Sequence, residues 1–100
     1  MEEGRYAEAE PMQRETLDIQ RRALGPRHLT TLVAMNNLAM SLQFEQRIAE
    51  AEKLWRETLD IQRRVLGPEH PGYLQSKLRL ATNVLEQGRY VEAERLQPRR

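Results

Sequence analysis

The sequence predicts an all-α protein built from repeated pairs of helices, and two observations support this. First, residues 4–45 and 46–87 align without a gap and share 21 identical residues, and 88–97 begins a third copy, so the period is 42 residues. Periods between about 20 and 50 residues are typical of repeat architectures. Second, apolar residues recur every three or four positions, as in amphipathic helices, and no window alternates with the period of a strand.

The first copy contains two expected helices. One covers residues 6–24 and ends at Gly25–Pro26, because glycine can take the left-handed conformation after a helix and proline cannot continue it. The other covers residues 30–44, and Thr30 or Thr31 can cap its first turn. Its apolar residues fall on one face, at Leu32, Met35, Leu38, Ala39 and Leu42.

The second copy repeats this pattern. A helix of about five turns is expected over 48–66 and ends at Gly67–Pro68, and another over 72–87 has Pro71 at its first turn. A short helix over 90–96 opens the third copy. We therefore expect a single domain over residues 1–100, with repeat units at about 4–45 and 46–87 and a partial unit at 88–97.

Composition excludes several functional classes. The chain has 100 residues, no cysteine and a formal net charge of +1. It therefore lacks disulfides and thiolate metal ligands, and it offers no electrostatic footprint for nucleic acid or anionic lipid. No apolar run reaches the roughly 20 residues that span a bilayer, and the N-terminus is too polar for a signal peptide. We expect a cytoplasmic protein without a membrane or nucleic-acid partner.

Fourteen of the sixteen basic residues are arginine, and many occupy equivalent places in the copies. Acidic and basic residues alternate at intervals of four, as Glu10, Arg14, Asp18, Arg22 and as Glu52, Arg56, Asp60, Arg64. Residues four apart are neighbours on a helix, so we expect weak surface ion pairs rather than phosphate contacts. Contact of some arginines with a protein partner is the alternative.

No catalytic or metal site is expected. His28 and His70 occupy the same loop position one period apart, without a carboxylate cluster, so we interpret them as loop or capping residues. The serines, Ser41 and Ser76, lie in no recognisable motif, and there is no glycine-rich phosphate loop. The sequence therefore predicts a protein that is not an enzyme and has no cofactor or metal.

Four segments of the repeat carry a family resemblance: Asn36–Ala39, the turn at Gln46–Arg47, the Ala-Glu-Ala-Glu run at 49–52, and Val65–Pro71. The chain resembles tetratricopeptide repeats of the kinesin light chain type, which use 42 residues instead of 34. The resemblance implies a right-handed α-solenoid, a superhelix of stacked antiparallel helix pairs. It also places small residues where paired helices approach closely, at Ala39, Ala51, Ala81 and Ala93.

Three departures from the repeat stand out. Asn36–Asn37 is replaced by Leu78–Arg79 in the next copy, Gln46 stands in place of a glycine, and Trp55 stands where the other copies have glutamine. Trp55 lies in the apolar stripe of its helix, so we interpret it as a core residue in preference to a binding hot spot.

The resemblance also implies a function. In that family the first helix of each pair lines a concave groove that binds peptides of partner proteins. Carried over by position, the groove residues here are Val33, Asn36, Asn37, Met40, Gln43, Phe44, Gln75, Leu78, Arg79, Thr82 and Glu86. Asparagine pairs with a peptide backbone, Arg79 with a carboxylate, and Met40 or Phe44 with apolar groups. Alternatively, these residues are only the outer faces of packed helices.

A second hypothesis is an assembly or scaffold role. The chain begins with the second helix of a repeat, as if taken from a longer array, so the first helix lacks a partner. Its open stripe is expected to contain Tyr6, Met12, Leu17 and Ile19. Burying that stripe by end stacking or helix exchange would give a homo-oligomer, and otherwise the monomer would be marginally stable.

Overall fold

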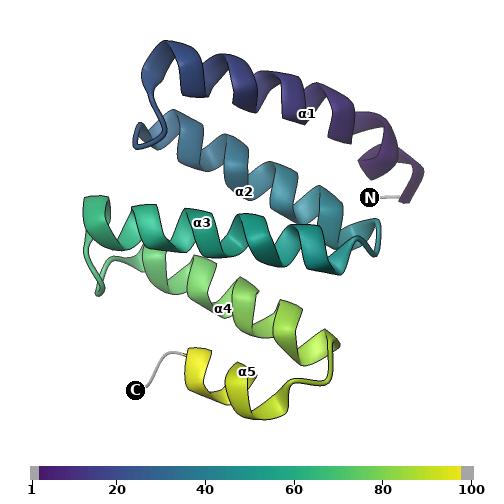
Figure 1. Cartoon of the computed structure of the whole chain (residues 1–100), viewed down its shortest axis with the longest axis vertical. Coiled ribbons are helices and arrows are strands. Elements are labelled where there is room, and N and C mark those ends of the chain that lie inside the picture. Colours follow the sequence, from purple (N-terminus) through teal and green to yellow (C-terminus); the bar gives the residue numbers. More distant parts are fainter. Residues whose placement is uncertain (1–2, 98–100) are drawn as a thin grey trace.

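The computed structural model describes the backbone of residues 3–97 and the side chains of residues 8–97 (Figure 1). The elements are α1 (Glu3–Leu24), α2 (Leu29–Phe44), α3 (Ile48–Leu66), α4 (Pro71–Glu86) and α5 (Tyr90–Leu96). No strand occurs in residues 3–97, so the predicted all-α class is confirmed. The expected bounds of the last four helices are correct to within one residue.

The helices run in alternating directions, and each packs against its neighbours along the chain (Figure 1). α2 and α4 begin at Leu29 and Pro71, and α3 and α5 begin at Ile48 and Tyr90. Both pairs of starting residues are one 42-residue period apart. The fold is therefore a helical-repeat solenoid, in which each unit buries its apolar face against the next.

The core follows the stripe expected on α2, where Leu32, Met35, Leu38, Ala39 and Leu42 are all buried. The four alanines at the expected close approaches are also buried, at positions 39, 51, 81 and 93. Trp55 is only 2% exposed, which confirms that it is a core residue.

Histidines cap the N-termini of α2 and α4. Nδ1 of His28 accepts a hydrogen bond from the backbone N–H of Thr30 at 3.1 Å, and Nδ1 of His70 accepts one from Gly72 at 2.9 Å. The expectation that Thr30 or Thr31 caps α2 is wrong. Both lie inside the helix, and the buried Thr31 hydroxyl donates instead to the carbonyl of Gln20 in α1, at 3.5 Å. The capping interpretation of the histidines and the place of Pro71 in the first turn of α4 are confirmed.

The end of α3 differs from the expected geometry in one respect. Gly67 has φ 94° and ψ 158°. This positive φ suits glycine, but the value of ψ is extended and not that of the left-handed helix.

The open stripe on α1 is narrower than expected. Met12 is 70% exposed and Ile19 is also exposed, but Leu17 is buried because its side of the helix faces the core shared with α2. The side chain of Tyr6 lies outside the described residues. One period later, Leu54 is only 9% exposed, because α3 has a helix on both sides.

Candidate functional site

A cavity of about 300 Å³ opens between α2 and α4, and the α2–α3 turn and α3 complete its wall. We call it the groove cavity. Its lining residues are Met40, Gln43, Phe44, Gln46, Trp55, Arg79, Thr82 and Glu86. Those on α2 and those on α4 are spaced by three or four residues, so each set shares one helix face.

Six of the eleven predicted groove residues therefore line one cavity, namely Met40, Gln43, Phe44, Arg79, Thr82 and Glu86. Val33 and Asn37 line a neighbouring cavity of about 160 Å³ between α1 and α2. Asn36, Gln75 and Leu78 line neither cavity. Asn36 is partly buried, and its Oδ1 has no hydrogen-bond partner among the described residues. Gln75 and Leu78 are exposed on α4.

Gln46 and Trp55 also line the cavity but are not among the predicted groove residues, because neither lies on a first helix of a pair. Trp55 is both a core residue and part of the cavity wall. Both residues depart from the repeat, since Trp55 replaces Gln13 and Gln46 stands where Gly88 stands in the next copy. Their departure from the repeat is the sequence feature that could have identified them as lining residues.

Arg79 is the cation left available in the groove cavity. Its guanidinium forms no hydrogen bond or ion pair with any side chain of the described region. Glu86 and Thr82 have partners: the carboxylate of Glu86 accepts a hydrogen bond from Nε2 of Gln43 at 2.8 Å, and the hydroxyl of Thr82 donates to the carbonyl of Leu78 at 3.1 Å. A ligand with a carboxylate would therefore find its counter-charge at Arg79.

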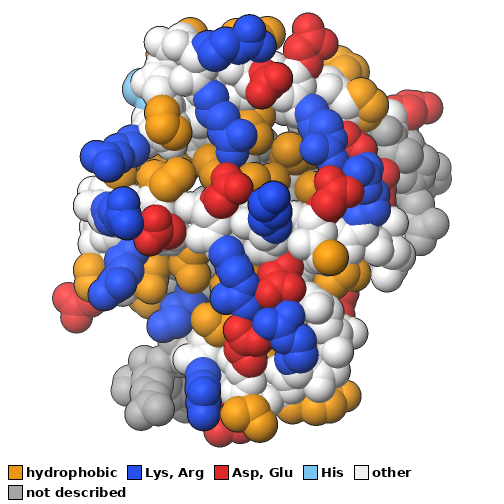
Figure 2. Space-filling view, viewed as in Figure 1, with side chains coloured by type: hydrophobic (Ala, Val, Ile, Leu, Met, Phe, Trp, Pro, Cys, Tyr) orange, Lys and Arg blue, Asp and Glu red, His pale blue; other side chains and the backbone are white. Residues whose placement is uncertain are grey.

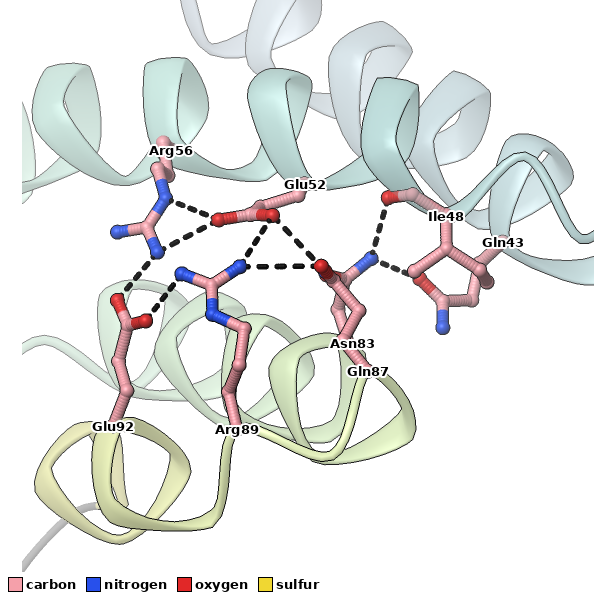
Figure 3. Close-up of polar contacts among 8 residues, drawn as sticks. All are labelled: Gln43, Ile48, Glu52, Arg56, Asn83, Gln87, Arg89 and Glu92. Carbon is pink, nitrogen blue, oxygen red and sulfur yellow. Dashed lines mark hydrogen bonds and ion pairs between the residues drawn. The ribbon is translucent and has the colours of Figure 1, made fainter.

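A buried amide holds one wall of the groove cavity in place (Figure 3). Asn83 is fully buried, and its Nδ2 donates to Oε1 of Gln43 at 2.6 Å and to the carbonyl of Ile48 at 3.1 Å. Its Oδ1 accepts from Nε2 of Gln87 at 2.8 Å. Asn83 thus joins α4 to the end of α2 and the start of α3, and both the nitrogen and the oxygen of its amide have hydrogen-bond partners inside the protein.

The network continues into a cluster of four charges that joins α3 to α5 (Figure 3), the junction cluster Glu52, Arg56, Arg89 and Glu92. Arg89 contacts Glu52 at 2.9 Å, and Arg56 contacts Glu92 at 2.6 Å. Partial burial opposes ionisation of Glu52, but hydrogen bonds from Gln87, Arg89 and Arg56 outweigh it and lower its pKa to about 2.

The same cluster occurs one period earlier, as Glu10, Arg14, Arg47 and Glu50. The expected pairs within helices are confirmed at Glu10–Arg14, Asp18–Arg22, Glu52–Arg56 and Asp60–Arg64. In addition, Arg14 of α1 forms an ion pair with Glu50 of α3 at 2.7 Å. The spacing of residues within one helix could not predict this contact, because it joins two helices. The charged side chains follow α1 and α3, with hydrophobic side chains in the hollows between the helices (Figure 2).

This charged face lies opposite the groove cavity. A cavity of about 360 Å³ between α1 and α3 has Lys53 at its edge and leucines in its wall. Lys53 and Trp55 are two residues apart on α3, which is about 200° around an α-helix. The two cavities therefore open on different sides of the molecule, and the charged face provides a control for experiments on the groove cavity.

Within the described region, no group of three or more His, Cys, Asp or Glu residues could hold a metal ion. None of the described helices has the length and hydropathy needed to cross a bilayer.

The low pKa of Glu52 predicts an acid dependence of stability. A carboxylate whose pKa falls from 4.5 to about 2 on folding stabilises the folded state above pH 4.5 and loses that contribution as the pH falls toward 2. We expect Glu52→Gln to lower the melting temperature at pH 7 and to flatten its dependence on pH between 4.5 and 2. The measurement is thermal denaturation followed by circular dichroism.

Asp60→Asn, at the exposed pair with Arg64, should leave the dependence of the melting temperature on pH unchanged. Equal profiles for Glu52→Gln and wild type would contradict this account.

Comparison with known proteins agrees with the repeat geometry. The sequence profile of the tetratricopeptide repeat matches residues 1–44 and 30–97. No curated protein sequence matches the chain. Tetratricopeptide repeats generally mediate protein–protein interactions and are typically not enzymes. From the two matches, which together span residues 1–97, the chain belongs to the tetratricopeptide repeat family.

Proposed function

We propose that the groove cavity binds an extended segment of a partner protein, with an apolar side chain between α2 and α4 and a carboxylate on Arg79. The observation that carries this proposal is the guanidinium of Arg79, which has no side-chain partner among residues 8–97 and lies beside an apolar wall. The period of 42 residues also supports our proposal that these repeats are of the kinesin light chain type.

The apolar part of the groove cavity suits a side chain. Met40, Phe44 and Trp55 line it, and methionine adapts its shape to different partners. Aromatic rings supply a large contact area for little conformational entropy. The cavity volume of about 300 Å³ is at the lower end of the range for ligand sites, about 300–1,000 Å³, which favours one or two side chains of a peptide.

The neighbouring cavity gives the bound segment a path across α2. Val33 and Asn37 line that cavity, on the side of α2 that faces α1, and both side chains are exposed. The amide of Asn37 offers a donor and an acceptor, as a peptide backbone requires. A segment anchored at Arg79 could therefore cross α2 and pair its backbone with Asn37.

The test begins with peptides selected from a random phage-displayed library on the wild-type chain and then synthesised with a fluorescent label. Arg79→Glu should weaken their binding at least about tenfold, because it replaces an attraction with a repulsion. Lys53→Glu makes the same change of charge on the opposite face and should leave affinity unchanged. Fluorescence anisotropy gives the affinities. Binding that is insensitive to Arg79→Glu would place the peptides outside the groove cavity.

A second candidate function is self-assembly through α1, and the exposure of Met12 and Ile19 favours it. A second copy that covered these side chains would bury an apolar stripe, as α3 is buried at Leu54. Sedimentation velocity should then show association that rises with concentration, and Ile19→Glu should abolish it. A wild-type chain that stays monomeric at all concentrations would reject this candidate.

A further inference from the structure

The turn between α2 and α3 contains an unusual backbone conformation. Gln46 has φ 66°, and it is the one non-glycine residue with positive φ in the described part of the chain. In this conformation the Cβ of an L-residue lies close to the following backbone carbonyl, so residues other than glycine adopt it at a cost. The protein therefore carries strain at this position.

The turn itself does not need the glutamine. One period later, Gly88 has φ 78° in the α4–α5 turn. The N–H of Gln46 bonds to the carbonyl of Gln43 at 3.1 Å, and the N–H of Gly88 bonds to Leu85 at 2.9 Å, which is the equivalent residue. The next N–H in each turn also bonds to equivalent carbonyls, at 2.9 and 3.0 Å. Glycine thus forms the same turn without a side chain.

Space does not explain the difference between the two turns. A Cβ placed at Gly88 would meet no atom within 4 Å, so a side chain fits there sterically and only the positive φ disfavours it. The two turns differ in what surrounds the residue: Gln46 lies at the groove cavity. Its side chain lines the groove cavity with Met40, Phe44 and Arg79, it is exposed, and it makes no hydrogen bond to another described side chain.

We infer that Gln46 contacts the ligand in the groove cavity and that the chain retains it there, in a strained backbone conformation, for binding and not for folding. Strain of this kind is characteristic of functional sites. The amide has one acceptor and two donor hydrogens, so it can bond to a backbone amide of the segment that Arg79 anchors. This inference rests on the proposed function.

The test separates stability from binding with substitutions at Gln46. Gln46→Gly should raise the melting temperature, because it relieves the strain, and should weaken the selected peptides about threefold or more. Gln46→Ala keeps Cβ and the strain, so it should weaken binding equally without raising the melting temperature. Gly88→Gln, at the equivalent turn, should lower the melting temperature and leave affinity unchanged.

The outcomes distinguish this inference from the groove proposal. If peptides weakened by Arg79→Glu bind Gln46→Gly as they bind wild type, the groove cavity remains the site and the inference about Gln46 is wrong. If Gln46→Gly fails to raise the melting temperature, the strain argument is wrong and the inference is overturned. If no selected peptide responds to Arg79→Glu, the groove proposal and the inference are both rejected.

Discussion

The packing of each helix against its neighbours along the chain is the constraint on which the rest of the structure depends. α2 and α4 are separated in sequence by α3, and each packs against it. The space where α2 and α4 face each other is therefore not filled by the core, and α3 supplies its wall through Trp55. The groove cavity is a consequence of the repeat, and its chemistry is set by the residues that depart from the repeat.

The free energies of the two kinds of interaction show which of them stabilises the fold. Complete burial of a large apolar side chain contributes about 1.5–3 kcal/mol, whereas an exposed ion pair contributes about 0–1 kcal/mol. Buried residues such as Trp55, Met35 and Leu80 therefore dominate stability. The junction cluster joins α3 to α5, and the equivalent cluster one period earlier joins α1 to α3. We interpret both clusters as fixing how successive repeat units align.

The helices could be predicted from the sequence because the 42-residue period and the Gly-Pro pairs mark their positions twice. The caps could be predicted only in part. The histidines were among the expected capping residues, but Thr30 was an equally suitable candidate for the cap of α2, and only the fold turns Thr31 toward α1. Contacts between helices, such as Arg14 with Glu50, depend on how the units stack. Part of the groove cavity was predictable from first-helix positions, but Gln46 and Trp55 enter it from the turn and from α3.

The central claim is that ligands enter between α2 and α4, and the single tryptophan of the chain reports on this directly. In a titration followed by two-dimensional NMR, a selected peptide should shift the indole N–H resonance of Trp55 and the methyl resonance of Met40. The amide resonances of Lys53 and Leu17, on the opposite side, should stay in place. Shifts confined to the face between α1 and α3, with Trp55 unchanged, would contradict the account.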